Sequence, residues 1–360
     1  RENALSKGAS VGRARTPYPP SEASFAKQSG YRGAVPQRRR IGLRKLEVLN
    51  ERTLSKDGKE ELSLVFRVNN RRLFMKGANW IPCDAYENRQ TPARYRDLLE
   101  SARAANMNML RVWGGGQYER DVFYDTCDEL GLVVQTEIPW VNECGTDTTL
   151  YSQPAYTANL HQQLREMIVN HYNHPSVVFW GLWNELGNID GSHPQGAKLD
   201  AQCVVATTRS LYELAHRLDS TRSVGFADAS FGMRTPELRQ GEHFDYFAFN
   251  AYNGWYSNCK TPEGAAKFSA TLDRLHQRAP ITAITEYGSG SNPYCHSLQP
   301  ELTTKPSVGG ARHDEEWGNI VHERHLQALE SAPWLQFSTG WILFDFAVGA
   351  RHEGYMLSDN

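Results

Sequence analysis

The chain has 360 residues, of which 22% are charged, 40% hydrophobic and 11% aromatic, and this composition excludes a disordered, collagen-like or coiled-coil protein. No segment approaches the run of about 18 apolar residues that a membrane-spanning helix requires, and the mean hydropathy is −0.58. The net charge of −2 gives no overall field that attracts nucleic acid or an anionic membrane. We therefore expect an uncharged substrate, no nucleic-acid partner and no membrane partner.

Basic residues are concentrated at the beginning of the chain. Residues 1–40 contain nine Lys or Arg side chains against two Glu side chains, and the remainder is acidic. Pro, Ser and Gly are frequent there without apolar periodicity, so we predict an extended or partly ordered arm over residues 1–39 that lies on its own acidic body. Because the chain begins with Arg1 and has no signal segment, we expect a fragment or a processed chain, and the sequence indicates no compartment.

Two short segments follow in which apolar and polar residues alternate. They cover residues 41–49 and 62–68, and a Lys56-Asp57-Gly58 turn lies between them. This pattern predicts a β-hairpin. We assign residues 40–70 to this hairpin, or to the end of an immunoglobulin-like β-sandwich.

From about residue 73 onward, short β-rich apolar runs alternate with longer stretches of helical periodicity. Thr91 followed by Pro92 is typical of a helix start. The predicted helices cover residues 91–107, 119–130, 156–172, 199–218, 262–277 and 314–331. The predicted strands number eight and cover residues 73–80, 109–114, 133–138, 177–185, 223–229, 246–252, 281–288 and 338–346.

Eight strands that each precede a crossover predict an α/β fold with a parallel sheet, and eight is the number that closes into a (β/α)8 TIM barrel. A doubly wound open sheet is the alternative. It would require a glycine-rich phosphate turn after the first strand, and Gly77-Ala78-Asn79-Trp80 is not such a turn. We therefore assign residues 71–360 to a TIM-barrel domain and expect no nucleotide cofactor.

Two predicted strands end in a carboxylate. The fourth ends at Asn184-Glu185 and the seventh at Thr285-Glu286. In a barrel of this kind, groups at the carboxyl ends of the strands meet around one pocket. Salt bridges are one interpretation of the two glutamates. The other is glycoside hydrolysis, which uses one carboxyl group as acid and base and a second as nucleophile or base.

Aromatic residues are frequent near the same strand ends. Sugar rings stack their apolar faces on indole, so an aromatic rim favours a carbohydrate substrate, although a single aromatic residue is more often part of a core. The aromatic residues at or just beyond predicted strand ends are Trp80, Trp113, Trp140, Trp183, Tyr252, Trp255 and Trp341.

Several motifs together resemble glycoside hydrolase family 2, the family of β-galactosidases, β-glucuronidases and β-mannosidases. The resemblance covers roughly residues 40–360. The motifs that carry it are His171-Tyr172-Asn173-His174-Pro175-Ser176, Trp183-Asn184-Glu185, Asn250-Ala251-Tyr252-Asn253-Gly254-Trp255-Tyr256, Thr285-Glu286-Tyr287-Gly288, and Phe344-Asp345-Phe346 with Arg351-His352-Glu353-Gly354.

The resemblance implies a retaining mechanism with two glutamates. Glu286 corresponds to the nucleophile that attacks the anomeric carbon, and Glu185 to the acid and base that first protonates the leaving oxygen and then activates water. The mechanism needs no cofactor.

The resemblance also implies roles around the two glutamates. Asn184 matches the asparagine that bonds the 2-hydroxyl group, Tyr252 the tyrosine that contacts the nucleophile, and Arg111 the arginine that keeps the nucleophile ionised. His174 and Pro175 precede the fourth strand and are interpreted as structural. Other candidate substrate-binding residues are Trp113, Trp80, Asp84, Trp255 and Trp341; Glu137 and Glu143, with Asp84, are ranked as supporting or subsite groups.

The motifs do not all point to the same sugar specificity. Residues 77–84 and 106–116 resemble the β-mannosidases, whereas the motifs of the second half resemble the β-galactosidases. Because more motifs agree with it, we expect a β-galactosidase type, with a β-mannosidase type of exo or endo action as the alternative. Members of the family usually begin with further β-domains, so missing N-terminal domains, or another chain that supplies them, are possible partners.

Two functions of other classes are the alternatives to a glycoside hydrolase. A carbohydrate-binding barrel without turnover would not require both glutamates. A metal-dependent proton-abstracting enzyme would require a cluster of ligands at the strand ends, and no convincing cluster is found there. The six cysteines are dispersed without the spacing of a zinc site, so we expect no metal.

Overall fold

The computed structural model describes residues 42–54, 58, 60–141, 153–186, 201–229, 238, 242–255, 262–277, 282–291, 295–300 and 314–346. The predicted basic arm over residues 1–39, the Lys56-Asp57 part of the hairpin turn and Glu143 lie outside these residues. The assignment of domain boundaries at residues 39 and 70 stays a prediction.

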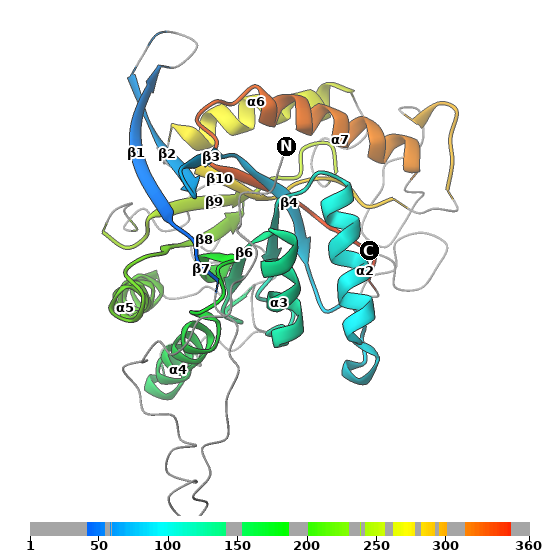
Figure 1. Cartoon of the computed structure of the whole chain (residues 1–360). Coiled ribbons are helices and arrows are strands. Elements are labelled where there is room, and N and C mark those ends of the chain that lie inside the picture. Colours follow the sequence, from blue (N-terminus) through cyan, green and yellow to red (C-terminus); the bar gives the residue numbers. More distant parts are fainter. Residues whose placement is uncertain are drawn as a thin grey trace, which may run out of the picture.

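Eight parallel strands close into a barrel, which confirms the predicted (β/α)8 fold (Figure 1). Around the barrel the order is β10-β11-β4-β5-β6-β7-β8-β9, so the first and last strands of the barrel, β4 and β11, pair with each other. The strands are β4 (Met75–Trp80), β5 (Met109–Val112), β6 (Val133–Glu137), β7 (Val177–Asn184), β8 (Ser223–Ala229), β9 (Tyr246–Asn250), β10 (Thr282–Glu286) and β11 (Phe337–Gly340).

The helices lie around the outside of the barrel (Figure 1). Thr91 caps α2 (Pro92–Ala104) with its side chain, which accepts a hydrogen bond from the backbone N–H of Arg94, as the Thr-Pro pattern predicts. No described helix is both long enough and apolar enough to span a bilayer. The helices are η1 (Glu87–Arg89), α2 (Pro92–Ala104), α3 (Asp121–Leu130), α4 (Pro154–His171), α5 (Ala201–Leu218), α6 (Pro262–His276) and α7 (Glu315–Glu330).

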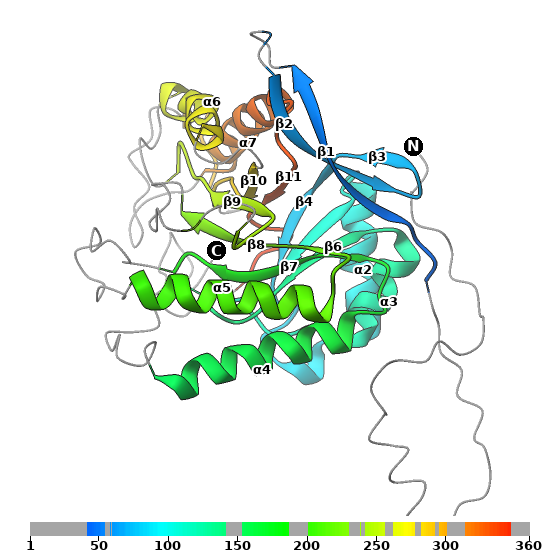
Figure 2. The same ribbon diagram turned by 90° about the vertical axis from the view of Figure 1, so that its left-hand side faces the viewer.

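The predicted hairpin is part of a three-stranded antiparallel sheet at one end of the barrel (Figure 2). β1 (Leu46–Leu54) pairs with β2 (Glu60–Val68), and a third strand that the pattern did not predict, β3 (Arg71–Leu73), returns along β2. The return is a two-residue turn in which Asn69 and Asn70 have φ values of 52° and 65°. Asparagine tolerates this left-handed conformation, which such hairpin turns require.

Phe66 of β2 closes the barrel at the amino ends of its strands, which is the lower end of the barrel. Its side chain is buried and lies edge-on to Phe179 of β7, with 4.8 Å between the ring centroids. Phe179 in turn contacts Tyr246 and Phe337, so aromatic rings fill the lower interior. Above this apolar layer the buried side chains are polar, among them Asn79, Arg111, Gln135, Glu137, Asn184, Asn250 and Thr285. The fold therefore places a polar layer at the carboxyl ends of the strands.

Candidate active site

Glu286 and Glu185 lie at the carboxyl ends of two barrel strands. Glu286 is the last residue of β10 and is 6% exposed, and Glu185 follows β7 directly. Glu185 has a φ of 43°, in the left-handed region that is uncommon for residues other than glycine, and its N–H donates to the carbonyl of Ala227. A hydrogen bond to β8 thus holds the backbone of Glu185 where its side chain leaves the strand.

Asn250 connects the two strand ends. Its side-chain amide donates to Oε1 of Glu185 at 2.9 Å and to Oδ1 of Asn184 at 3.0 Å. Its own oxygen accepts a hydrogen bond from the hydroxyl of Thr285 at 2.7 Å, directly before Glu286. The network therefore fixes Glu185 relative to the end of β10.

Arg111 of β5 is fully buried between two carboxylates. Its Nη1 donates to Oε1 of Glu286 at 2.9 Å, and its Nη2 donates to Oδ1 of Asn184 at 2.6 Å. Its Nε and Nη2 also donate to the two oxygens of Glu137 at 2.7 and 3.0 Å. Asn79 accepts a further bond from Nη1 at 2.9 Å. One guanidinium thus connects strands on opposite sides of the barrel.

Glu286 accepts hydrogen bonds on both oxygens, because the hydroxyl of Tyr252 donates to Oε2 at 2.6 Å. Burial raises the pKa of Glu286 to about 7, although the charge of Arg111 lowers it, and the negative charge of Glu185 adds to the rise. The carboxyl therefore titrates near neutrality. Acid and base chemistry at neutral pH requires two carboxyl groups that do not both ionise at low pH.

Two of the predicted aromatic residues form a partly exposed rim. Trp113 follows β5 and Trp341 follows β11, and their rings meet edge to face with 5.1 Å between the centroids. A Cβ at Gly115 would lie 2.0 Å from the Trp113 ring, so glycine is needed for the backbone to pass that close. Trp255, only 5% exposed, presents little surface to a ligand.

The structure contradicts the substrate-binding assignment of Trp80. Asn79 points into the barrel toward Arg111, so the next side chain points outward. There Trp80 is fully buried against Tyr95 of α2 and Phe123 of α3, and its Nε1 donates to Glu119. The placement of Trp183 at the rim is wrong for the same reason: its ring stacks on Phe226 and its Nε1 donates to Thr208 of α5.

Asp84 lies in the segment between β4 and α2. Its carboxylate accepts hydrogen bonds from the side chain of Arg89 at 2.9 Å and from the backbone N–H of Tyr86 at 3.0 Å. Both contacts are local, and neither joins Asp84 to the two glutamates. A contact with substrate therefore stays a prediction.

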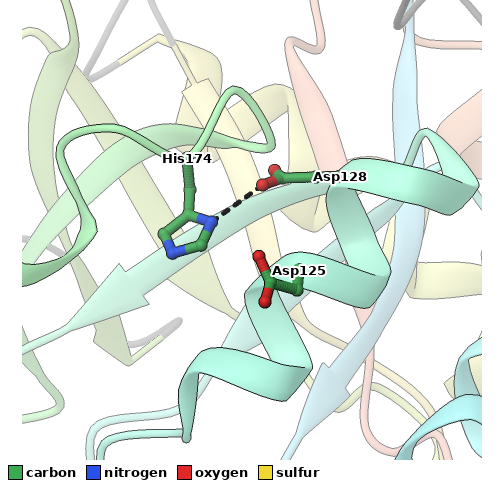
Figure 3. Close-up of side chains that lie close together, drawn as sticks. All are labelled: Asp125, Asp128 and His174. Atoms are coloured by element: carbon green, nitrogen blue, oxygen red, sulfur yellow. Dashed lines mark hydrogen bonds and ion pairs between the residues drawn. The ribbon is translucent and has the colours of Figure 1, made fainter. Parts of the chain in front are cut away.

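His174 lies near the opposite end of the barrel, as the sequence predicts. Its Nδ1 and Oδ2 of Asp128 are 2.8 Å apart (Figure 3). Oδ1 of Asp128 accepts a hydrogen bond from the backbone N–H of Ser176 at 2.9 Å. Asp125, three residues earlier on α3, points toward the same pair. These bonds tie the end of α3 to the segment that enters β7.

Sequence reasoning assigned no role to Asn79, Asn250 and Thr285, which are buried and hydrogen bonded within the site. It also ranked Glu137 below the contact that this residue makes with Arg111. One signal could have found the two asparagines, since each is a polar residue near the carboxyl end of a predicted barrel strand.

A family model described as "Glycosyl hydrolases family 2, TIM barrel domain" matches residues 62–331. The chain is 32% identical over 270 residues to a β-glucuronidase of Bacteroides fragilis, a match that covers 73% of this chain and 34% of that protein. It is 38% identical over 128 residues to a β-mannosidase of Mus musculus, which covers 36% of this chain and 14% of that protein. The chain therefore spans about a third or less of the length of these curated relatives.

The fold resembles that of solved β-glucuronidases. The structure of the Bacteroides uniformis enzyme superposes with a TM-score of 0.69 at 24% identity, over 90% of this chain and 35% of that chain. At this identity the likeness concerns the fold alone.

Proposed function

We propose, because this chain belongs to family 2 of the glycosyl hydrolases, that it removes a terminal β-linked hexose from a glycoside. The observation that carries the proposal is the position of the two carboxyl groups. Glu185 and Glu286 lie at the carboxyl ends of two barrel strands, and Asn250 and Arg111 hold them within one hydrogen-bonded network. Paired carboxyl groups at the mouth of a pocket are the groups that glycoside hydrolysis uses.

The proposed mechanism is a double displacement with retention. Glu286 attacks the anomeric carbon as the carboxylate while Glu185 gives its proton to the leaving oxygen, and a glycosyl ester of Glu286 forms. Glu185, now a carboxylate, takes a proton from water, which attacks the ester and releases the sugar. Arg111 and Tyr252 support this assignment, because each donates to one oxygen of Glu286 and so aims the carboxylate.

Asn184 is proposed to bond the 2-hydroxyl group. Arg111 and Asn250 both donate to its oxygen, which fixes the orientation of the amide and turns the NH₂ group away from them. A bond from this amide that strengthens in the transition state would lower the barrier. Trp113 and Trp341 are proposed to stack on the sugar.

For the sugar itself, we place a β-mannoside first. The curated relatives described above are a β-glucuronidase and a β-mannosidase, and they do not support the expected β-galactosidase type. A uronic acid is disfavoured because three carboxyl groups, Glu137, Glu185 and Glu286, face a single arginine, Arg111, among the described residues of the site, and the described rim is aromatic. Identity is higher to the β-mannosidase, although over a shorter match, and the motifs of the first half agree with it. A β-galactoside stays the second candidate.

The test is hydrolysis of aryl β-mannoside, β-galactoside, β-glucuronide and β-glucoside by the wild type, Glu286→Gln, Glu185→Gln and Glu119→Gln. Glu119→Gln is the matched control, since it also removes a buried carboxylate but lies outside the barrel between α2 and α3. We expect both site variants to lose at least about 1,000-fold in kcat and the control to keep its activity. Proton NMR of the first-formed sugar tests retention.

The outcomes separate the hypotheses. Cleavage of one glycoside that Glu286→Gln abolishes supports the proposal and names the sugar. Equal sugar binding by all four proteins without cleavage would identify a binding barrel and overturn it. Release of the inverted sugar would overturn the assignment of Glu286 as nucleophile.

A further inference from the structure

We propose that Glu137 is a positioning residue that holds Arg111 and sets how strongly it binds the Glu286 carboxylate. This inference rests on the proposed function, because it assigns a role in the ionisation of the nucleophile. Glu137 makes no hydrogen bond to Glu286 and acts on it through the guanidinium that both contact.

Four donors hold the Glu137 carboxylate. Besides Nε and Nη2 of Arg111, the side chain of Gln135 donates to Oε1 at 2.8 Å and the backbone N–H of Gly114 donates to Oε2 at 3.2 Å. The side chain has no exposed surface. A carboxylate held on both oxygens by two strands has one geometry, and it imposes that geometry on Arg111.

The neighbouring strand provides the space for this side chain. Glu137 lies beside Gly181 of β7 in the barrel, and a Cβ on Gly181 would lie only 2.2 Å from Cγ of Glu137. Such a distance is incompatible with any other residue unless Glu137 moves. Glycine in the middle of a buried strand weakens that strand, so its presence here indicates that the position of Glu137 requires it.

The bonds of Arg111 are unequally divided between the two carboxylates. Glu137 receives two of them, from Nε and Nη2, whereas Glu286 receives one, from Nη1. The groups that face this cluster are Glu185 beside Glu286, the hydroxyl of Tyr252 on Oε2, and Tyr246 of β9, which lies within electrostatic range of Glu137 and Arg111. Among the groups that most strongly affect Glu286, Arg111 is the one cation.

This division of charge has a chemical consequence. If Glu137 were neutral, the full positive charge of Arg111 would act on Glu286, and the pKa of Glu286 would fall. A carboxylate of lower pKa is a weaker nucleophile. Glu137 thus keeps Glu286 basic enough to attack, while Arg111 still aims it.

The experiment is the pH dependence of kcat/KM for Glu137→Gln on whichever aryl glycoside the wild type cleaves. We expect the acid limb to move to lower pH by about one unit, and kcat on the plateau to fall at least about tenfold. Glu137→Asp keeps the charge and should keep the wild-type acid limb. Gly181→Ala displaces Glu137 from Arg111 and should move the limb in the same direction as Glu137→Gln. Glu119→Gln is the matched control and should change neither quantity.

A Glu137→Gln protein that folds and keeps the wild-type acid limb would overturn the inference, and so would an equal shift in Glu119→Gln. If Glu137→Gln does not fold, Gly181→Ala decides between the same two outcomes. A wild type inactive on every glycoside would instead overturn the proposed function, so the two failures are distinguishable.

Discussion

Arg111 contributes one positive charge to a site that contains three carboxyl groups. It is fully buried, and its N–H groups reach Glu137, Glu286, Asn184 and Asn79. A buried charge of this kind is stabilising only while all its partners are present, because removal of one leaves the others unpaired in a medium that solvates charge poorly. The planar fork of five donors explains why arginine occupies the position.

Arg111→Lys is expected to damage both stability and turnover. Lysine keeps the charge but cannot reach four acceptors in fixed directions, so acceptors on several strands lose their donor. We expect the free energy of unfolding to fall by about 3 kcal/mol and kcat to fall by about 100-fold or more. Urea unfolding and kinetics on the active glycoside measure the two effects. Wild-type kcat in the variant would show that charge alone is sufficient at this position.

The raised pKa of Glu286 predicts a cost in stability at alkaline pH. Because its pKa in the folded protein, about 7, lies above the ordinary glutamate value, the folded state binds this proton more tightly than the unfolded state. The stabilisation that this bound proton gives to the folded state is present at low pH and is lost as the pH rises through 7. The ionised carboxyl then costs on the order of 3 kcal/mol.

The stability of Glu286→Gln, which is neutral at every pH, should therefore improve relative to the wild type between pH 5 and pH 8. Urea unfolding of both proteins at the two pH values measures the difference. If the stability difference is the same at both pH values, Arg111 and Tyr252 already compensate the charge of Glu286 in full.

Strand β4 illustrates how far the sequence predicts a site at the scale of an element. The apolar run placed the strand correctly to within a few residues at its start, yet Trp80 was assigned to the wrong face. Side chains alternate between faces along a strand, so an error of one residue in register reverses inside and outside. Asn79 and Trp80 are adjacent, and only the pairing of β4 with β5 decides which of them meets Arg111.

The sequence predicted only part of the structure at the lower end of the barrel. The alternating pattern over residues 41–68 predicted a hairpin, but not the short strand β3 or the insertion of Phe66 under Phe179. Three-residue strands carry too few side chains to show a period. The contact of Phe66 is long-range and depends on the packing of β2 against the barrel.

Phe66→Ala is expected to destabilise the protein without a matching loss of catalysis. Removing the ring opens a cavity among Phe179, Tyr246 and Phe337, at the end of the barrel opposite the carboxylates. We expect the free energy of unfolding to fall by about 3–5 kcal/mol with kcat changed less than about threefold.

Phe74→Ala is the matched control, because Phe74 is 45% exposed and removal of an exposed ring costs little. Urea unfolding compares the two variants. Equal stability of Phe66→Ala and Phe74→Ala would show that the sheet does not support the barrel.

At the scale of the whole molecule, the barrel separates stability from chemistry. Its lower interior is aromatic and apolar, and its upper interior is polar and charged. The alternation of strands and helices was sufficient to predict this fold. The residues implied by the resemblance, Glu185, Glu286, Asn184, Tyr252 and Arg111, are brought together by the structure, and their roles stay proposals.

The supporting groups were harder to predict because they depend on three-dimensional contacts. Glu137, Asn250 and Thr285 act through bonds to residues far away in the sequence, and a single sequence does not show which polar residues within strands will meet.

The proposed hydrolytic activity is expected to depend steeply on pH below neutrality. The proposed attack by Glu286 requires its ionised form, and its pKa is about 7, so kcat/KM should fall about tenfold for each pH unit below that value. Initial rates between pH 4 and 9, with circular dichroism as a control for unfolding, measure the profile. The two carboxyl groups interact, so the profile reports values of the pair. A limb near pH 4.5 in folded protein would contradict the prediction.

The pairing of β4 with β11 bears on how the protein is made. Asn79 of β4 donates to the carbonyl of Gly340, 261 positions later in the chain. During synthesis β4 therefore leaves the ribosome long before its second neighbour exists, and one edge of the growing sheet keeps unpaired backbone N–H and C=O groups until β11 emerges. Translation pauses between these strands should increase aggregation of the nascent chain, and chaperones that cover strand edges should raise the yield of soluble protein.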